Sequence, residues 1–79
     1  MRINITETDL MGEYGGGWSE NASIVRRYTL DVSEDATDLA ISRRILALVG
    51  PGYRRDDWCQ SDFGPWRSGC MGVYADIEQ

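Results

Sequence analysis

The 79-residue sequence contains no histidine, and all eight of its basic side chains are arginines. Without histidine there is no side chain that ordinarily exchanges a proton near neutral pH, and without lysine no side-chain amine can form a Schiff base. Histidine is also the commonest metal ligand, and two cysteines alone would need carboxylates to complete a metal site. We therefore expect no catalytic residue, no bound metal and no cofactor.

The sequence also lacks any long hydrophobic run. Its longest strongly apolar stretch, residues 45–49, is far shorter than the roughly 20 residues that a membrane-spanning helix needs. Residues 1–6 contain no apolar segment of the kind found in secretory signals. These absences predict a cytoplasmic protein that does not enter a membrane. In that compartment Cys59 and Cys70 are expected to stay reduced, with a disulfide across a hairpin as the alternative.

What the chain does contain is typical of one folded domain, residues 1–79. Hydrophobic residues make up 42% of it and charged residues 27%, as in ordinary globular proteins. Alternating polar and apolar residues predict strands at 2–8, 23–32 and 70–77, the first two antiparallel. Residues 33–49 predict a helix with Ser33 as its N-cap and Gly50 after its end.

Two connections separate these elements. A glycine-rich loop is predicted at residues 9–22, and a long aromatic loop at 51–69, where a short strand near 57–61 is the alternative. The element order is then β-β-α-β, or β-β-α-β-β with that extra strand. Either order predicts an α+β domain in which one helix packs on one face of a small antiparallel sheet of three or four strands.

The charge balance is acidic, with thirteen Asp and Glu against eight Arg and a net charge of −5. Such a balance repels nucleic-acid phosphates and favours a basic partner. Six of the eight arginines nevertheless form adjacent pairs, at residues 26–27, 43–44 and 54–55. Paired arginines can build a local phosphate site, or they can simply pair with the surplus carboxylates of the same chain.

Acidic and aromatic residues are the candidates for partner binding. Acidic residues cluster at the predicted helix start and again after the helix, and aromatic residues beside charges are typical of interface hot spots. Trp58, Phe63 and Trp66 have an alternative role as filler for a small core. The predicted partner-binding residues are Glu13, Tyr14, Trp18, Glu20, Glu34, Asp35, Asp38, Asp56, Asp57 and Trp66.

The acidic-aromatic stretch at residues 12–20 and the acidic helix start at 34–38 belong to a short, acidic chain. In these respects the chain resembles small phage and mobile-element inhibitors of host defence, such as anti-CRISPR proteins and DNA-mimicking antirestriction proteins. The resemblance implies a non-enzymatic protein of the host-cell cytoplasm that occludes a basic nucleic-acid-binding surface of a host protein or ribonucleoprotein effector. The arginine pairs favour a shaped protein contact over DNA mimicry alone. The expected state is a monomer or weak dimer.

Two other functions fit the same residues. One is direct binding of a nucleic acid or nucleotide by the paired arginines and aromatic side chains, against which the net charge argues. The other is a structural or self-associating phage subunit that docks through a stripe of small residues on the helix, Ala36, Ala40 and Ala47.

Overall fold

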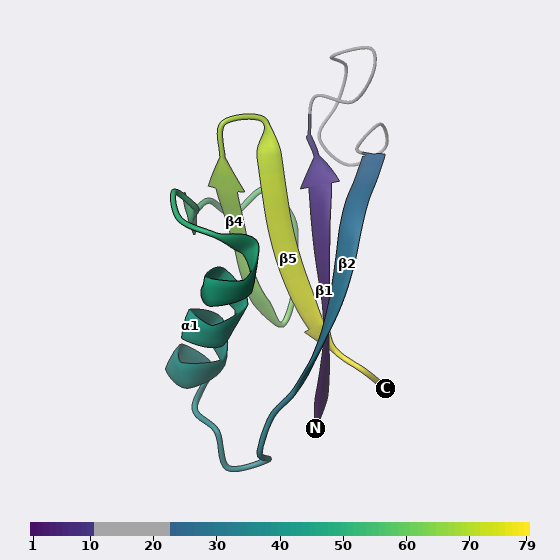
Figure 1. Ribbon diagram of the computed structural model, residues 1–79, viewed down its shortest axis with the longest axis vertical. Helices are drawn as coiled ribbons and strands as arrows, with labels where there is room; N and C mark the ends of the chain where they lie inside the picture. Colours follow the sequence, from purple (N-terminus) through teal and green to yellow (C-terminus); the bar gives the residue numbers. More distant parts are fainter. Residues whose placement is uncertain (11–22) are drawn as a thin grey trace.

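The fold is built on antiparallel strands that are not all neighbours in sequence. The computed structural model describes residues 1–10 and 23–79. The sheet has the strand order β2-β1-β5-β4-β3, and one helix lies against one of its faces (Figure 1). This confirms the α+β class, with five strands in place of the predicted three or four. The elements are β1 (Arg2–Asp9), β2 (Ser23–Asp31), α1 (Asp38–Val49), β3 (Arg54–Arg55), β4 (Phe63–Ser68) and β5 (Met71–Ile77).

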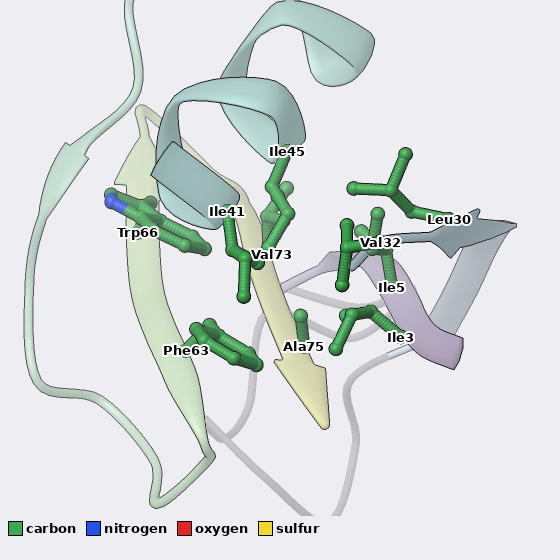
Figure 2. Close-up of a cluster of buried hydrophobic side chains, with 10 residues drawn as sticks. All are labelled: Ile3, Ile5, Leu30, Val32, Ile41, Ile45, Phe63, Trp66, Val73 and Ala75. Atoms are coloured by element: carbon green, nitrogen blue, oxygen red, sulfur yellow. The ribbon is translucent and has the colours of Figure 1, made fainter. Parts of the chain in front are cut away.

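The core lies between α1 and the sheet. Alternation in β1 turns Ile3 and Ile5 toward the helix, and both are fully buried. Figure 2 shows Ile41 and Ile45 pointing from the helix toward the sheet, between the aromatic side chains of β4 and the aliphatic side chains of β1 and β2. The strands predicted at residues 2–8, 23–32 and 70–77 are confirmed as β1, β2 and β5. The buried cluster consists of Ile3, Ile5, Leu30, Val32, Ile41, Ile45, Phe63, Trp66, Val73 and Ala75.

The helix begins later than predicted. Its N-cap is Thr37, whose Oγ1 accepts a hydrogen bond from the backbone N–H of Ala40 at 3.1 Å. Ser33 instead forms a separate turn, in which its Oγ accepts from the N–H of Asp35 at 3.2 Å. Serine side chains favour such local turns as readily as helix caps, so Ser33 as the N-cap was wrong. The predicted end is confirmed, since Gly50 closes the helix with φ +105° and its N–H donates to the carbonyl of Leu46.

The aromatic segment is not one loop. Within residues 51–69 lie the short strand β3, at Arg54–Arg55 rather than 57–61, and the six-residue strand β4. The Gly64–Pro65 sequence predicted a turn, but β4 pairs with β5 around a register shift between Phe63 and Trp66. Proline is tolerated at such an irregularity because no ladder hydrogen bond needs its missing N–H. Burial of two aromatic side chains against the helix favours the strand over the turn.

Part of the opposite face of the sheet is covered by the segment between β3 and β4. Trp58 lies there, with its indole against Gly72 of β5 and its ring edge-on to Tyr74, the two centroids being 5.8 Å apart. Its Nε1–H donates to the carbonyl oxygen of Trp66 at 3.0 Å. Leu10, which follows β1, is buried in the same layer. The other residues of the predicted glycine-rich loop, 11–22, lie outside the described part of the chain.

Candidate functional site

Strand order and register bring distant carboxylates to one end of the molecule. Arg2 of β1 lies opposite Asp31 of β2, and the backbone N–H of Glu78 donates to the carbonyl of Arg2. The end of β2, the start of β1 and the end of β5 therefore meet there, and Figure 1 shows both termini and the turn before α1 at this same end. We call it the acidic end; among the described residues it comprises Asp31, Glu34, Asp35, Asp38, Asp62, Asp76 and Glu78.

Four of these carboxylates form ion pairs or accept hydrogen bonds within the chain. Arg2 bridges Asp31 at 3.5 Å and Glu78 at 3.6 Å, and all three side chains are largely exposed. Asp62 and Asp76 fasten the start of β4 to the end of β5. The N–H of Asp62 donates to Asp76 Oδ1 at 2.9 Å, and the N–H of Ile77 donates to Asp62 Oδ2 at 2.8 Å. These contacts hold the acidic end in a defined shape.

Glu34, Asp35 and Asp38 are the carboxylates of this end that face solvent without such a partner. All three are exposed, and none of the arginines in the described ranges makes an ion pair with them. The backbone that carries Glu34 and Asp35 is held in a turn, because the N–H of Ala36 donates to the carbonyl of Ser33 at 3.0 Å. Asp38 opens the helix, where the helix dipole favours a negative charge.

The other predicted partner-binding residues are distributed differently. Asp56 and Asp57 follow β3, at the sheet edge opposite β2, and they pair with Arg67 at 3.5 Å and Arg55 at 3.1 Å. Strand order therefore separates them from Glu34 and Asp35. Trp66 as a partner-binding residue is wrong, because its side chain is only 6% exposed and packs in the core. Glu13, Tyr14, Trp18 and Glu20 lie outside the described residues.

An exposed leucine beside the acidic end is a binding candidate that is not among the residues predicted from the sequence. Leu39 directly follows Asp38 and is 61% exposed. At 100° per residue it lies at the border of the apolar face, where sequence periodicity does not decide between core and surface. On the same helix Ala40 and Ala47 are exposed, whereas Ala36 packs against the core. The predicted alanine stripe is therefore incomplete.

The arginine pairs do not act as pairs. Neighbouring residues of a strand point to opposite faces, so Arg26 and Arg27, like Arg54 and Arg55, diverge. In each pair one arginine contacts its own chain. Arg26 donates to Tyr28 Oη at 3.4 Å, Arg44 to the carbonyl of Asp31 at 3.3 Å, and Arg55 to Asp57. The second members, residues 27, 43 and 54, are exposed and form no ion pair with the described residues.

Tyr53 and Cys59, which lie outside the acidic end, have raised pKa values. Burial, followed by a 3.0 Å hydrogen bond to Glu7 Oε2, raises the pKa of Tyr53 to about 12. Burial and then the charge of Asp76 raise the pKa of the Cys59 thiol. A raised pKa keeps the thiol protonated and weakly nucleophilic. Cys59 and Cys70 are both free thiols, and Cys70 is exposed.

Comparisons with protein families, with curated proteins and with solved structures found no match to this chain. Among residues 1–10 and 23–79, no three carboxylate or thiol side chains converge as metal ligands do. No helix in the described ranges has the length and hydropathy needed to cross a membrane. Function is therefore argued from the surface of the molecule, where the acidic end gathers seven of the described carboxylates.

Proposed function

We propose that this chain is a non-enzymatic binding protein whose acidic end docks on a basic, nucleic-acid-binding surface of a larger protein or ribonucleoprotein complex. The observation that carries the proposal is the gathering of seven carboxylates, from residues 31–38, 62 and 76–78, at one end of the described molecule. The arginines described there are Arg2, which pairs with two of these carboxylates, and Arg44, which donates to the carbonyl of Asp31. Mutual repulsion of the carboxylates costs stability in the isolated protein. A basic partner offsets that cost on binding.

Exposed carboxylates of this kind act mainly on the rate of encounter. A surface of one sign raises the association rate with an oppositely charged surface, and salt screens the effect over about 8 Å at physiological ionic strength. Glu34, Asp35 and Asp38 are the residues that provide this steering, because no arginine of the described chain competes for them. Arginine- and lysine-lined channels that hold nucleic acid are the surfaces that such a patch fits best.

Charge alone does not hold a complex together, and an apolar anchor is expected within the contact. Leu39 supplies one, since its exposed side chain adjoins Asp38 on a rigid helix. Tyr14 and Trp18 remain predicted anchors from the sequence. Together these features fit an inhibitor that occludes an effector by shape and charge, as the anti-CRISPR-like proteins that the chain resembles do.

The test compares two variants of equal net charge. Glu34→Gln/Asp35→Asn removes two unpaired carboxylates of the acidic end and leaves the helix-opening Asp38 in place. Asp56→Asn/Asp57→Asn removes two carboxylates at the opposite sheet edge. Surface plasmon resonance against immobilised, guide-loaded RNA-guided nucleases measures association, with target DNA as competitor.

We expect the first variant to associate about tenfold more slowly at low ionic strength, and the second to associate as fast as the parent. The difference should shrink as salt is raised, because these charges are exposed. An equal loss in both variants would show that net charge alone matters. Unchanged association of the first variant would exclude the acidic end as the contact.

A further inference from the structure

Arginines of two neighbouring strands line a surface pocket at the sheet edge opposite β2. Arg54 of β3 lies directly opposite Arg67 of β4, so their side chains share a face. Arg55 adjoins them, and the three line this pocket of about 390 Å³ together with Asp56 and Gly69. The pocket is formed by β3, the residue that follows it, β4 and the turn after β4. The adjacency of Arg54 and Arg55 in the sequence therefore does not by itself predict this pocket.

Arg67 is held in a fixed orientation within this pocket. Its Nε–H donates to the carbonyl oxygen of Gly69 at 2.7 Å, and its Nη1 lies 3.5 Å from Asp56 Oδ2. Arg55 is directed by its 3.1 Å contact with Asp57. Arg54, in contrast, is exposed and forms no ion pair or side-chain hydrogen bond within the described chain. The pocket thus combines the oriented guanidinium group of Arg67 with that of Arg54, which remains available.

Like charges directly opposite each other on neighbouring strands are destabilising, and Arg54 and Arg67 are such a pair. Asp56 offsets part of this repulsion through Arg67, and Asp57 engages Arg55. The described residues that line the pocket include three arginines and one carboxylate, that of Asp56, in a chain whose net charge is −5. An anion bound between Arg54 and Arg67 would remove the repulsion.

We propose that this pocket binds the phosphate group of a small phosphorylated molecule. The planar guanidinium fork matches phosphate oxygens, and a doubly charged anion can engage two arginines at once. The volume suits one small ligand. A nucleic-acid strand fits less well, because its further phosphates would meet the acidic remainder of the chain. The site lies apart from the acidic end and acts independently of it.

The experiment titrates the full chain with inorganic phosphate, with adenosine monophosphate and with acetate at low salt, followed by amide NMR shifts. Both phosphate probes should bind saturably with a dissociation constant near or below about 1 mM, shifting the amides around Arg54 and Gly69. Acetate should bind far more weakly. Absence of saturable shifts up to about 10 mM phosphate, or equal binding of acetate, would overturn the proposal.

Two substitutions with opposite expected effects make the assignment specific. Arg54→Gln should weaken phosphate binding by about two- to fivefold, the loss expected for one exposed ion pair. Arg43→Gln, which removes one exposed arginine on the helix, is the matched control and should change nothing. Asp56→Asn should tighten binding, because it removes the carboxylate that competes for Arg67. Equal weakening by the two arginine variants, or weaker binding in Asp56→Asn, would overturn the site.

An oligothymidylate of 12 residues extends the same titration to nucleic acid. We expect the oligothymidylate to bind no more tightly than adenosine monophosphate, because only one of its phosphates enters the pocket. Much tighter binding that falls steeply with salt would overturn the small-ligand assignment in favour of a nucleic-acid site. Thermal melts of all variants verify folding, which Arg54→Gln is expected to preserve because that side chain is exposed.

Discussion

Substitution of Gly72 by alanine should destabilise the protein, although alanine normally favours a strand over glycine. Among the described glycines, residues 50, 52, 64 and 69 have positive φ angles, and Gly72 does not. Glycine is therefore required at residue 72 because a side chain would not fit there, and not because of its backbone conformation. A Cβ atom built there would lie 2.7 Å from Cζ2 and 2.9 Å from Cε2 of Trp58, and 2.8 Å from Cδ1 of Leu10.

The indole cannot move away freely. Its Nε1–H is bonded to the carbonyl of Trp66 and its ring packs edge-on to Tyr74. Forcing an extra carbon into such packing costs about 1–3 kcal/mol, and the entropic gain of Gly→Ala recovers about 0.4–1 kcal/mol. We expect a net loss of about 1–2 kcal/mol in the free energy of unfolding. For a domain of this size, that is a fall of roughly 4–16 °C in melting temperature.

A double-mutant cycle with Trp58→Ala identifies the cause. In the Trp58→Ala background, Gly72→Ala should be neutral or stabilising, because the remaining close atom is the end of the flexible Leu10 side chain. The coupling energy should then be about 1–2 kcal/mol. Urea unfolding followed by far-ultraviolet circular dichroism measures all four proteins without depending on Trp58 fluorescence. A stable Gly72→Ala single variant, or a loss that persists without Trp58, would refute the packing argument.

Three further changes test other parts of the molecule. Thr37→Ala should lower the free energy of unfolding by about 1 kcal/mol, because the helix loses its N-cap acceptor. Folding raises the pKa of Tyr53 from 10.0 to about 12, so the free energy of unfolding should fall as the pH rises between these values. In denaturation curves measured at several pH values, Tyr53→Phe should reduce this fall. In a thiol titration with Ellman's reagent near pH 8, exposed Cys70 should react before Cys59, whose pKa burial raises.

Each of these has its own control. Ser33→Ala should cost less than Thr37→Ala, because the Ser33 hydroxyl closes a local turn and accepts from no N–H of the helix. An equal or larger cost for Ser33→Ala would contradict Thr37 as the N-cap. Glu7→Gln should lower the pKa of Tyr53 only in part, because burial is the larger cause. A return to the ordinary tyrosine value would contradict that order. Rapid reaction of both thiols in the parent would contradict the burial of Cys59.

The elements that sequence predicted well are those whose signal is local. Alternation in β1 and β5 identifies their buried residues, because successive side chains of a strand must point to opposite faces. The start of the helix was missed because Ser33 and Thr37 are both good caps followed by acidic residues. Tertiary geometry decides between them. The N–H of Val32 still donates to the carbonyl of Met1, so the chain leaves the sheet only after residue 32 and needs the 33–36 turn to reach the helix layer.

The strand β4 was missed for a different reason. Gly64 and Pro65 are local turn signals, whereas the burial of Phe63 and Trp66 depends on a helix and a strand elsewhere in the chain. Local chemistry therefore predicted the wrong element, and the same burial removed Trp66 from the candidate surface. Asp56 and Asp57 were grouped with the helix-start acids on sequence alone. Placement of β2 and β3 at opposite edges of the sheet separates the two groups.

Sequence alone determined what chemistry is absent, the net charge, the α+β class and most of the inward-facing residues. These properties depend on composition or on the period of a single strand or helix. Only the tertiary structure decided which charges are neighbours: Asp31 and Glu78 around Arg2 at one end, and Arg54 with Arg67 at one sheet edge. The physical reason is that electrostatic interaction depends on distance in space, and a strand order of β2-β1-β5-β4-β3 makes that distance independent of separation along the chain.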